Sequence, residues 1–138
     1  MPYFSDAQEV YDTIGRLFRD LIDDEELAPR FRKADTIVQY RYSEPESTIT
    51  VRLQENEDGE VAFGETAMEP EVTMTMKADT AHRFWLGKVN VTMAIARGEI
   101  KAEGPVAKIL RLVPLTKPVF PRYRGLLEES GREDLIGV

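Results

Sequence analysis

The sequence contains no cysteine and only one histidine, His82, among its 138 residues. The lack of cysteine excludes disulfides, thiolate metal ligands and cysteine nucleophiles, and one histidine is too few for the usual zinc sites. No apolar run approaches the roughly 20 residues that cross a bilayer. The N-terminus lacks the basic segment followed by an apolar one that marks a secretory signal. We therefore expect a cytoplasmic protein, and the length fits a single domain with a core of its own.

Charge is unevenly distributed along the chain, whose formal net charge is −7. Residues 1–28 and 44–71 are strongly acidic, whereas residues 83–124 hold nine basic residues against two acidic ones. A solvated surface of mixed charge is the ordinary explanation of this pattern. A basic face that makes transient contact with an anionic membrane, or that binds an acidic partner, is the alternative. We expect no nucleic-acid partner, because the chain is acidic overall and its basic stretch lacks interleaved aromatic residues.

Hydrophobic periodicity predicts helices at both ends of the chain and strands between them. The predicted helices are 6–22, capped by Ser5, a short one from Asp23, one from Asp79 to Gly87, one over 90–96, one from Pro105 and one over 122–129. The predicted strands are 38–42, 48–53, 61–63, 72–77 and 99–102. The first four strands, joined by turns, favour an antiparallel meander with one apolar face, which the helices must cover. The tail beyond Gly131 is expected to be loosely held.

No catalytic set stands out in the sequence. There is no Gly-x-Ser-x-Gly elbow and no glycine-rich phosphate loop. His82 follows closely on the start of a predicted helix, where we expect an exposed histidine without a catalytic role. Runs of acids such as 23–26 are typical of solvated faces and helix starts. An enzyme that acts on a hydrophobic substrate, with His82 or a buried acid as its base, remains an alternative.

Flexible apolar residues gather in the second half of the chain. Met74 and Met76 alternate on one strand, and Met93 lies in a segment expected to pack near it. Phe84 and Trp85 are adjacent and, in a helix, can both reach one interior. Methionine is flexible and polarisable, which suits a wall that must fit guests of different shape. Plain core packing explains the same residues.

The segment from Ala78 to Gly104 resembles the signature region of the sterol carrier protein-2 (SCP2) family. The residues that carry the resemblance are, in order, Asp79, Phe84, Gly87-Lys88, Arg97-Gly98, Ile100-Lys101 and Gly104. With the strands before this segment and the helix over 6–22, the resemblance covers about residues 5–115. Val91 departs from the pattern, because proline is frequent there in the family.

The resemblance implies an α/β (α+β) sandwich in which helices cover one face of a five-stranded, mostly antiparallel sheet. An apolar tunnel would lie between the layers, and residues 115–138 would extend the single domain of residues 1–138. The implied function is non-catalytic binding and transfer of a sterol, fatty acid, acyl-CoA or similar lipid, without a cofactor. An interaction or dimerisation module without bound lipid is the alternative within the same family, so a homodimer stays open.

Within such a tunnel we predict ten wall residues and two residues for a head group. The wall residues are Phe18, Leu21, Met74, Met76, Phe84, Trp85, Met93, Ile95, Ile109 and Leu110. Lys88 and Arg97 are predicted to hold an anionic head group, on the basis of the local excess of positive charge alone. No metal site is expected.

Overall fold

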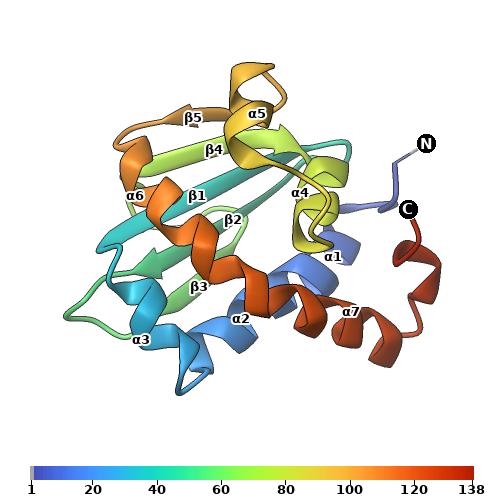
Figure 1. Cartoon of the computed structure of the whole chain (residues 1–138), viewed down its shortest axis with the longest axis horizontal. Coiled ribbons are helices and arrows are strands. Elements are labelled where there is room, and N and C mark those ends of the chain that lie inside the picture. Colours follow the sequence, from blue (N-terminus) through green and yellow to red (C-terminus); the bar gives the residue numbers. More distant parts are fainter. Residues whose placement is uncertain (1) are drawn as a thin grey trace.

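The computed structural model describes residues 2–138 and shows helices packed on a five-stranded sheet (Figure 1). The strands are β1 (Thr36–Ser43), β2 (Ser47–Leu53), β3 (Glu60–Phe63), β4 (Val72–Lys77) and β5 (Lys101–Glu103). The α-helices are α1 (Ala7–Val10), α2 (Arg16–Asp23), α3 (Leu27–Arg32), α4 (Ala78–Trp85), α5 (Val91–Ala96), α6 (Val106–Leu112) and α7 (Phe120–Glu129). The remaining helical turns are η1 (Tyr11–Gly15), η2 (Val113–Val119) and η3 (Glu133–Leu135).

The strand order of the sheet is β3-β2-β1-β4-β5. Three neighbouring pairs are antiparallel, and the β1–β4 pair is parallel. The predicted mostly antiparallel sheet is therefore confirmed, but the predicted meander is wrong after β3. Residues 64–71 carry the chain back past β2, so that β4 lies beside β1. This connection is too long for a tight hairpin turn, which is why β4 does not pair with β3.

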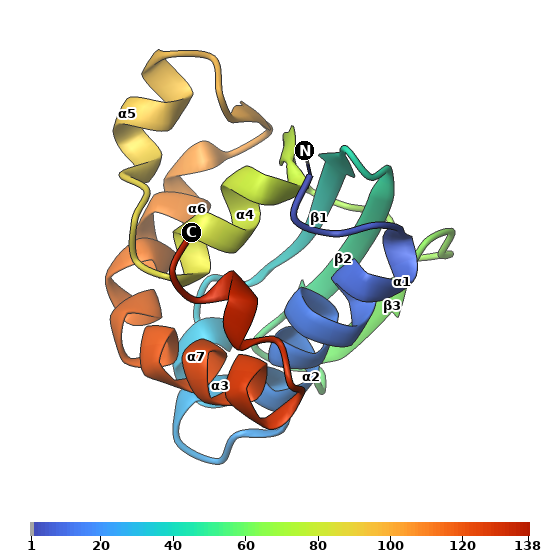
Figure 2. The same ribbon diagram turned by 90° about the vertical axis from the view of Figure 1, so that its right-hand side faces the viewer.

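One face of the sheet is apolar because alternate side chains along each strand point to the same side. On β1 these side chains are Val38, Tyr40 and Tyr42, and the register places Val51 beside Val38 and Met76 beside Tyr42. Figure 2 shows the helices gathered on one side of the sheet. The predicted sandwich, with helices on one face, is confirmed.

The opposite face of the sheet carries its own polar contacts. Gln39 Nε2 donates to Thr50 Oγ1 at 3.2 Å, and Arg41 Nε donates to Gln39 Oε1 at 2.8 Å. Thr50 is fully buried, so this cross-strand chain satisfies a hydroxyl that would otherwise destabilise the sheet. The polar face therefore needs no helix to cover it, and all the helices can pack on the apolar face.

The N-terminal helix departs from the prediction at its start. Asp6, not Ser5, caps it, because the Asp6 carboxylate accepts the Glu9 N–H at 3.0 Å. The π-helical turn η1 then interrupts the predicted helix. Within η1, Gly15 lies so close to the Phe63 ring that an added Cβ would be 2.6 Å from it. A glycine here lets the helix approach β3 closely.

The C-terminal segment is tied to α4 through His82. This side chain is fully buried, and its Nε2 lies 2.8 Å from the carbonyl oxygen of Leu135. Because a carbonyl only accepts, Nε2 carries the proton, and the neutral ring accepts the Tyr123 hydroxyl at Nδ1 over 2.7 Å. The expectations of an exposed histidine and a loose tail are both wrong. The inward residues of α4 recur at helical spacing, and His82 is one of them: Ala78, Ala81, His82 and Trp85.

The pH dependence of stability tests the role of His82. Burial lowers the pKa of His82 below its ordinary value of 6.5, with Lys88 and Arg132 adding to the effect and Leu135 and Asp79 opposing it. The unfolded chain therefore binds this proton more readily than the folded chain. Stability should fall as the pH drops through 6.5 toward the lower folded-state pKa.

Urea unfolding at about pH 7 and about pH 5 measures this loss. The wild-type protein should lose more stability over this interval than His82→Gln, because the glutamine at position 82 binds no proton. Carboxylates contribute equally to both proteins. If the two proteins lose equal stability, the buried, neutral state of His82 does not contribute to the pH dependence.

A second prediction concerns two glycines of the segment from Ala78 to Gly104. It tests whether the close approach of Gly104 to the Glu71 backbone contributes to stability. Gly104 has a φ of +97°, and an added Cβ would lie 2.3 Å from the backbone oxygen of Glu71. Gly98 has a similar φ of +78°, but it faces open space. Gly104→Ala should lower the free energy of unfolding by about 3 kcal/mol, and Gly98→Ala by about 1 kcal/mol. Urea unfolding measures both, and equal effects would show that the Glu71 contact does not matter.

Candidate functional site

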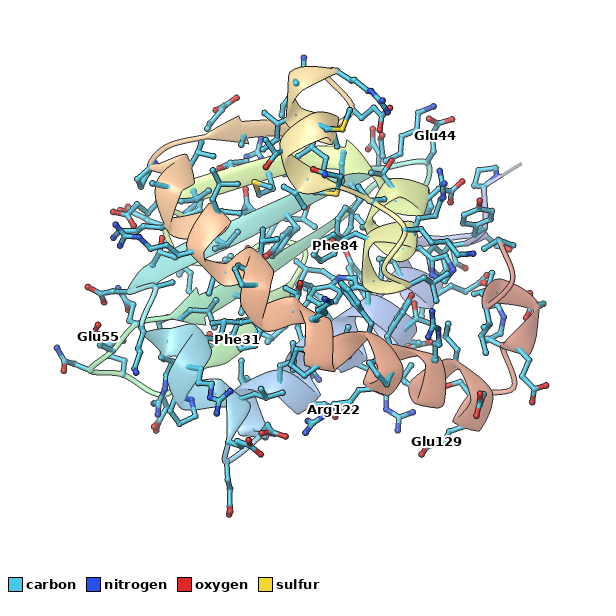
Figure 3. The ribbon with its side chains drawn as sticks, in the orientation of Figure 1. Phe31, Glu44, Glu55, Phe84, Arg122 and Glu129 are labelled. Atoms are coloured by element: carbon cyan, nitrogen blue, oxygen red, sulfur yellow. The ribbon has the colours of Figure 1, made fainter. Side chains whose placement is uncertain are left out.

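A hollow of about 80 Å³ lies between the apolar face of the sheet and the helices. The sheet contributes its floor, and α2, α3, α4, α6 and η2 contribute most of its sides and roof. It is lined by Phe18, Leu21, Ile22, Ala28, Phe31, Arg32, Tyr40, Tyr42, Val51, Leu53, Gly59, Met74, Met76, Ala81, Phe84, Trp85, Val91, Ile100, Ile109, Leu112, Val113 and Thr116. In Figure 3, Phe31 lies on α3 at one side of this region and Phe84 lies on α4 at the other.

The hollow is small for a binding site. It has room for several water molecules, whereas small-molecule sites usually measure about 300 Å³ or more. A lipid-sized guest therefore enters only if side chains of the wall change rotamer or the helices move outward. The wall contains side chains suited to this, because Met74 and Met76 have flexible, polarisable side chains.

Four aromatic rings meet edge to face or offset in the wall. Phe18 stacks on Tyr40 at 5.0 Å between centroids and meets Trp85 edge-on at 5.6 Å. Phe84 contacts Trp85 at 4.9 Å on one side and Phe120 of α7 at 5.8 Å on the other. The C-terminal helix thus supports the wall from behind, although its own residues do not line the hollow.

The polar groups of the wall carry little charge. Burial raises the pKa of both Tyr40 and Tyr42, so that both phenols stay neutral. The Thr116 hydroxyl donates to the Val113 carbonyl at 2.6 Å and is satisfied there. Arg32, at the end of α3, is the one charged residue of the lining. The hollow therefore favours apolar matter over most of its surface.

Seven of the ten predicted wall residues line the hollow. They are Phe18, Leu21, Met74, Met76, Phe84, Trp85 and Ile109. Met93 and Leu110 lie instead on the surface, 48 % and 40 % exposed, and Ile95 is half-buried outside the lining. The two short helices turn other residues inward: Val91 and Ala94 on α5, and Ile109 and Leu112 on α6. The prediction that Met93, Ile95 and Leu110 line the wall is therefore wrong.

The two predicted head-group residues do not line the hollow either. Lys88 Nζ donates to the carbonyl oxygen of Val138, and Arg97 is an exposed residue at the C-terminal end of α5. The excess of positive charge along the sequence thus did not identify a basic residue that lines the hollow. Asn90 caps α5 by accepting the Met93 N–H at 3.1 Å, so this helix begins at Val91 without the proline frequent in the family.

Several lining residues escaped the sequence-based prediction. Tyr40 and Tyr42 alternate with Arg41 on a predicted strand, and this period of two was enough to place them on the apolar face. Phe31 follows the predicted start of a short helix at Asp23 and was not assigned to the wall. Arg32 follows it directly, and no spacing or motif marks it.

The site offers no support for a catalytic role of His82. Both of its ring nitrogens are engaged within the protein, so it cannot take up a substrate proton without breaking these contacts. Within residues 2–138, no three side chains among histidine, aspartate and glutamate are grouped so that they could hold a metal ion. Over the same residues, no helix combines the length and the apolar character needed to cross a membrane.

The fold and the hollow define a class of protein: an α/β sandwich whose one-faced sheet and covering helices enclose an apolar interior. A family model described as "SCP-2 sterol transfer family" matches residues 14–117. The chain belongs to this family. The matched region ends within η2, so α7 and η3 lie beyond it.

Solved structures show the same fold. Sterol carrier protein 2 from Yarrowia lipolytica, in its apo form, has a TM-score of 0.62 and 22 % identity, covering 75 % of this chain and 87 % of that one. Palmitated SCP2L2 from Aedes aegypti has a TM-score of 0.56 and 19 % identity, covering 78 % and 94 %. At these identities the likeness concerns the fold alone.

A curated relative is a much longer protein. Mouse hydroxysteroid dehydrogenase-like protein 2 is 25 % identical over 114 residues, which make up 83 % of this chain and 22 % of the mouse protein. The rat protein of the same name matches over 20 % of its length. The chain thus spans about a fifth of the length of these relatives.

Proposed function

We propose that this chain binds a hydrophobic small molecule, such as a sterol, fatty acid or acyl-CoA, between sheet and helices, and transfers it without chemical change. The observation that carries the proposal is an apolar hollow whose floor holds two methionines and whose sides hold aromatic rings. Membership of a sterol transfer family supports it. A palmitated relative of the same fold supports a fatty acid as one guest.

Binding would draw its free energy from apolar surface removed from water, at about 25 cal/mol per Å². Against this stands the cost of opening a hollow of only 80 Å³. Rotamer changes of Met74 and Met76 provide room at low cost, because methionine has several rotamers of similar energy. The proposed wall consists of the seven predicted residues that line the hollow, together with Phe31, Tyr40 and Tyr42.

The small hollow also favours a second candidate, an interaction or dimerisation module that carries no lipid. Extraction of the purified protein with organic solvent, followed by mass spectrometry, separates the two. Native mass spectrometry before extraction should show protein with bound lipid, and the extract should contain it. A protein that stays empty after exposure to lipid vesicles supports the module.

Membrane contact is a further part of the proposal. A second, more open hollow of about 380 Å³ lies between α3 and α6. Its lining includes Arg30, Lys33 and Arg111, and it shares Leu112 with the apolar hollow. Basic side chains at this place suit an anionic bilayer from which a lipid could enter.

Trp85 provides a direct readout of guest binding, because it is the single tryptophan of the chain and lines the hollow. Titration with palmitate should change its fluorescence to saturation. Ala81→Leu places three additional carbons in the hollow and should weaken palmitate binding by about tenfold, an order-of-magnitude expectation for lost space in an apolar site.

Ala107→Leu is the matched control, because Ala107 is exposed on α6 and does not line the hollow. This variant should bind palmitate as the wild-type protein does. Thermal unfolding establishes that both variants fold. If Ala81→Leu binds as tightly as Ala107→Leu, the guest does not occupy this hollow.

A further inference from the structure

Arg32 differs from the other residues that line the hollow, because it has a buried polar atom without a partner. Its Nε is buried and has no hydrogen-bond partner. Every other buried side-chain nitrogen or oxygen of residues 2–138 has one. Buried polar groups in folded proteins nearly always have a partner. An unsatisfied donor on the wall of a site therefore points to a group that binds there.

The rest of the guanidinium shows which edge is available. Nη1 donates to the backbone oxygen of Glu57 at 3.3 Å, which fixes the end of the side chain against the loop between β2 and β3. Nε and Nη2 donate to no residue of the described chain. These two N–H groups form one edge of the planar guanidinium, and that edge matches the two oxygens of a carboxylate.

The charge of Arg32 is also uncompensated. Arginine is a cationic side chain, and Arg32 takes part in none of the salt bridges of residues 2–138. The neighbouring Arg30 differs, because it pairs with Glu26. A cation on an otherwise apolar wall favours an anion over a neutral group, because only the anion gains a direct Coulomb attraction to it.

The position of Arg32 gives the site a polarity. Arg32, Gly59 and Leu53 lie at one end of the hollow, near the start of β1, because Leu53 pairs with Thr36. Tyr42 lines the other end, six residues farther along β1, which corresponds to roughly 20 Å. Between the two ends the lining is apolar or aromatic. One charged end and a long apolar remainder match a single-headed amphiphile.

We propose that Arg32 is the head-group anchor of the site, and that its Nε–Nη2 edge binds the carboxylate of a fatty acid whose chain runs toward Tyr42 and Trp85. This inference rests on the proposed function and narrows its ligand class to long-chain carboxylates. Arg32 replaces Lys88 and Arg97 in the role that the charge pattern had assigned to them.

The test compares two guests with the same chain and different heads, palmitate and 1-hexadecanol, by Trp85 fluorescence at a pH where the fatty acid is ionised. The wild-type protein should bind palmitate the more tightly. Arg32→Gln should weaken palmitate binding by about tenfold or more, as expected for a lost charge-assisted pair. It should leave hexadecanol binding unchanged.

Arg83→Gln is the matched control: it removes the same charge from an exposed position on α4, and Arg83 lines neither hollow. It should leave the affinity for both guests as in the wild-type protein. Arg32→Lys keeps the charge but loses the forked edge, so palmitate affinity should fall between those of the wild type and Arg32→Gln. This variant also provides the answer if Arg32→Gln does not fold.

The outcomes separate the two proposals. If the wild-type protein binds neither guest, the proposed function fails and the anchor fails with it. If both guests bind but Arg32→Gln and Arg32→Lys leave palmitate affinity unchanged, or weaken both guests equally, the hollow is a lipid site and the anchor is wrong. If Arg83→Gln weakens palmitate binding as strongly as Arg32→Gln does, general surface charge accounts for the effect, and the anchor is again overturned.

Discussion

The helices of this protein do not pack fully against the apolar face of its sheet. The hollow between the two layers exists because this packing is incomplete. Large rings meet edge-on there, as Phe18 and Trp85 do with an interplanar angle of 85°, and both of these rings line the hollow. Unfilled space reduces stability, because the lining loses dispersion contacts. A fold that keeps a hollow of 80 Å³ between its layers needs its helices held from outside.

The C-terminal segment supplies much of this support. Its contacts reach the N-terminal helices, the α2–α3 turn and α4: Arg16–Glu129, Arg132–Glu9, Arg122–Asp24 and the His82 hydrogen bonds to Tyr123 and Leu135. The pKa of Asp24 is lowered first by the Leu27 N–H at the start of α3 and then by Arg122. The Arg16–Glu129 pair is exposed and contributes little by itself, whereas both hydrogen bonds of His82 are buried. The segment beyond the family match thus holds helices on more than one side of the hollow.

The sequence predicted most of the helices and strands, and seven of the ten proposed wall residues lie at the hollow, because both follow from periodicity. Alternation on β4 placed Met74 and Met76 correctly, and the order of Phe84, Gly87 and Gly104 pointed to the family. Short helices defeated the same reasoning: α5 and α6 have only six and seven residues, so one residue of rotation moves Met93 or Leu110 to the surface. Arg32 could not be found at all, since its significance lies in a hydrogen bond that it lacks.

The central claim is that a guest lies between the sheet and the helices. Nuclear Overhauser contacts between the methylene chain of bound palmitate and the methionine methyl groups test it most directly. The account predicts contacts to Met74 and Met76, which line the hollow, and none to Met93, which is 48 % exposed on α5. Contacts to Met93 alone, or bound palmitate without contact to Met74 or Met76, would contradict it.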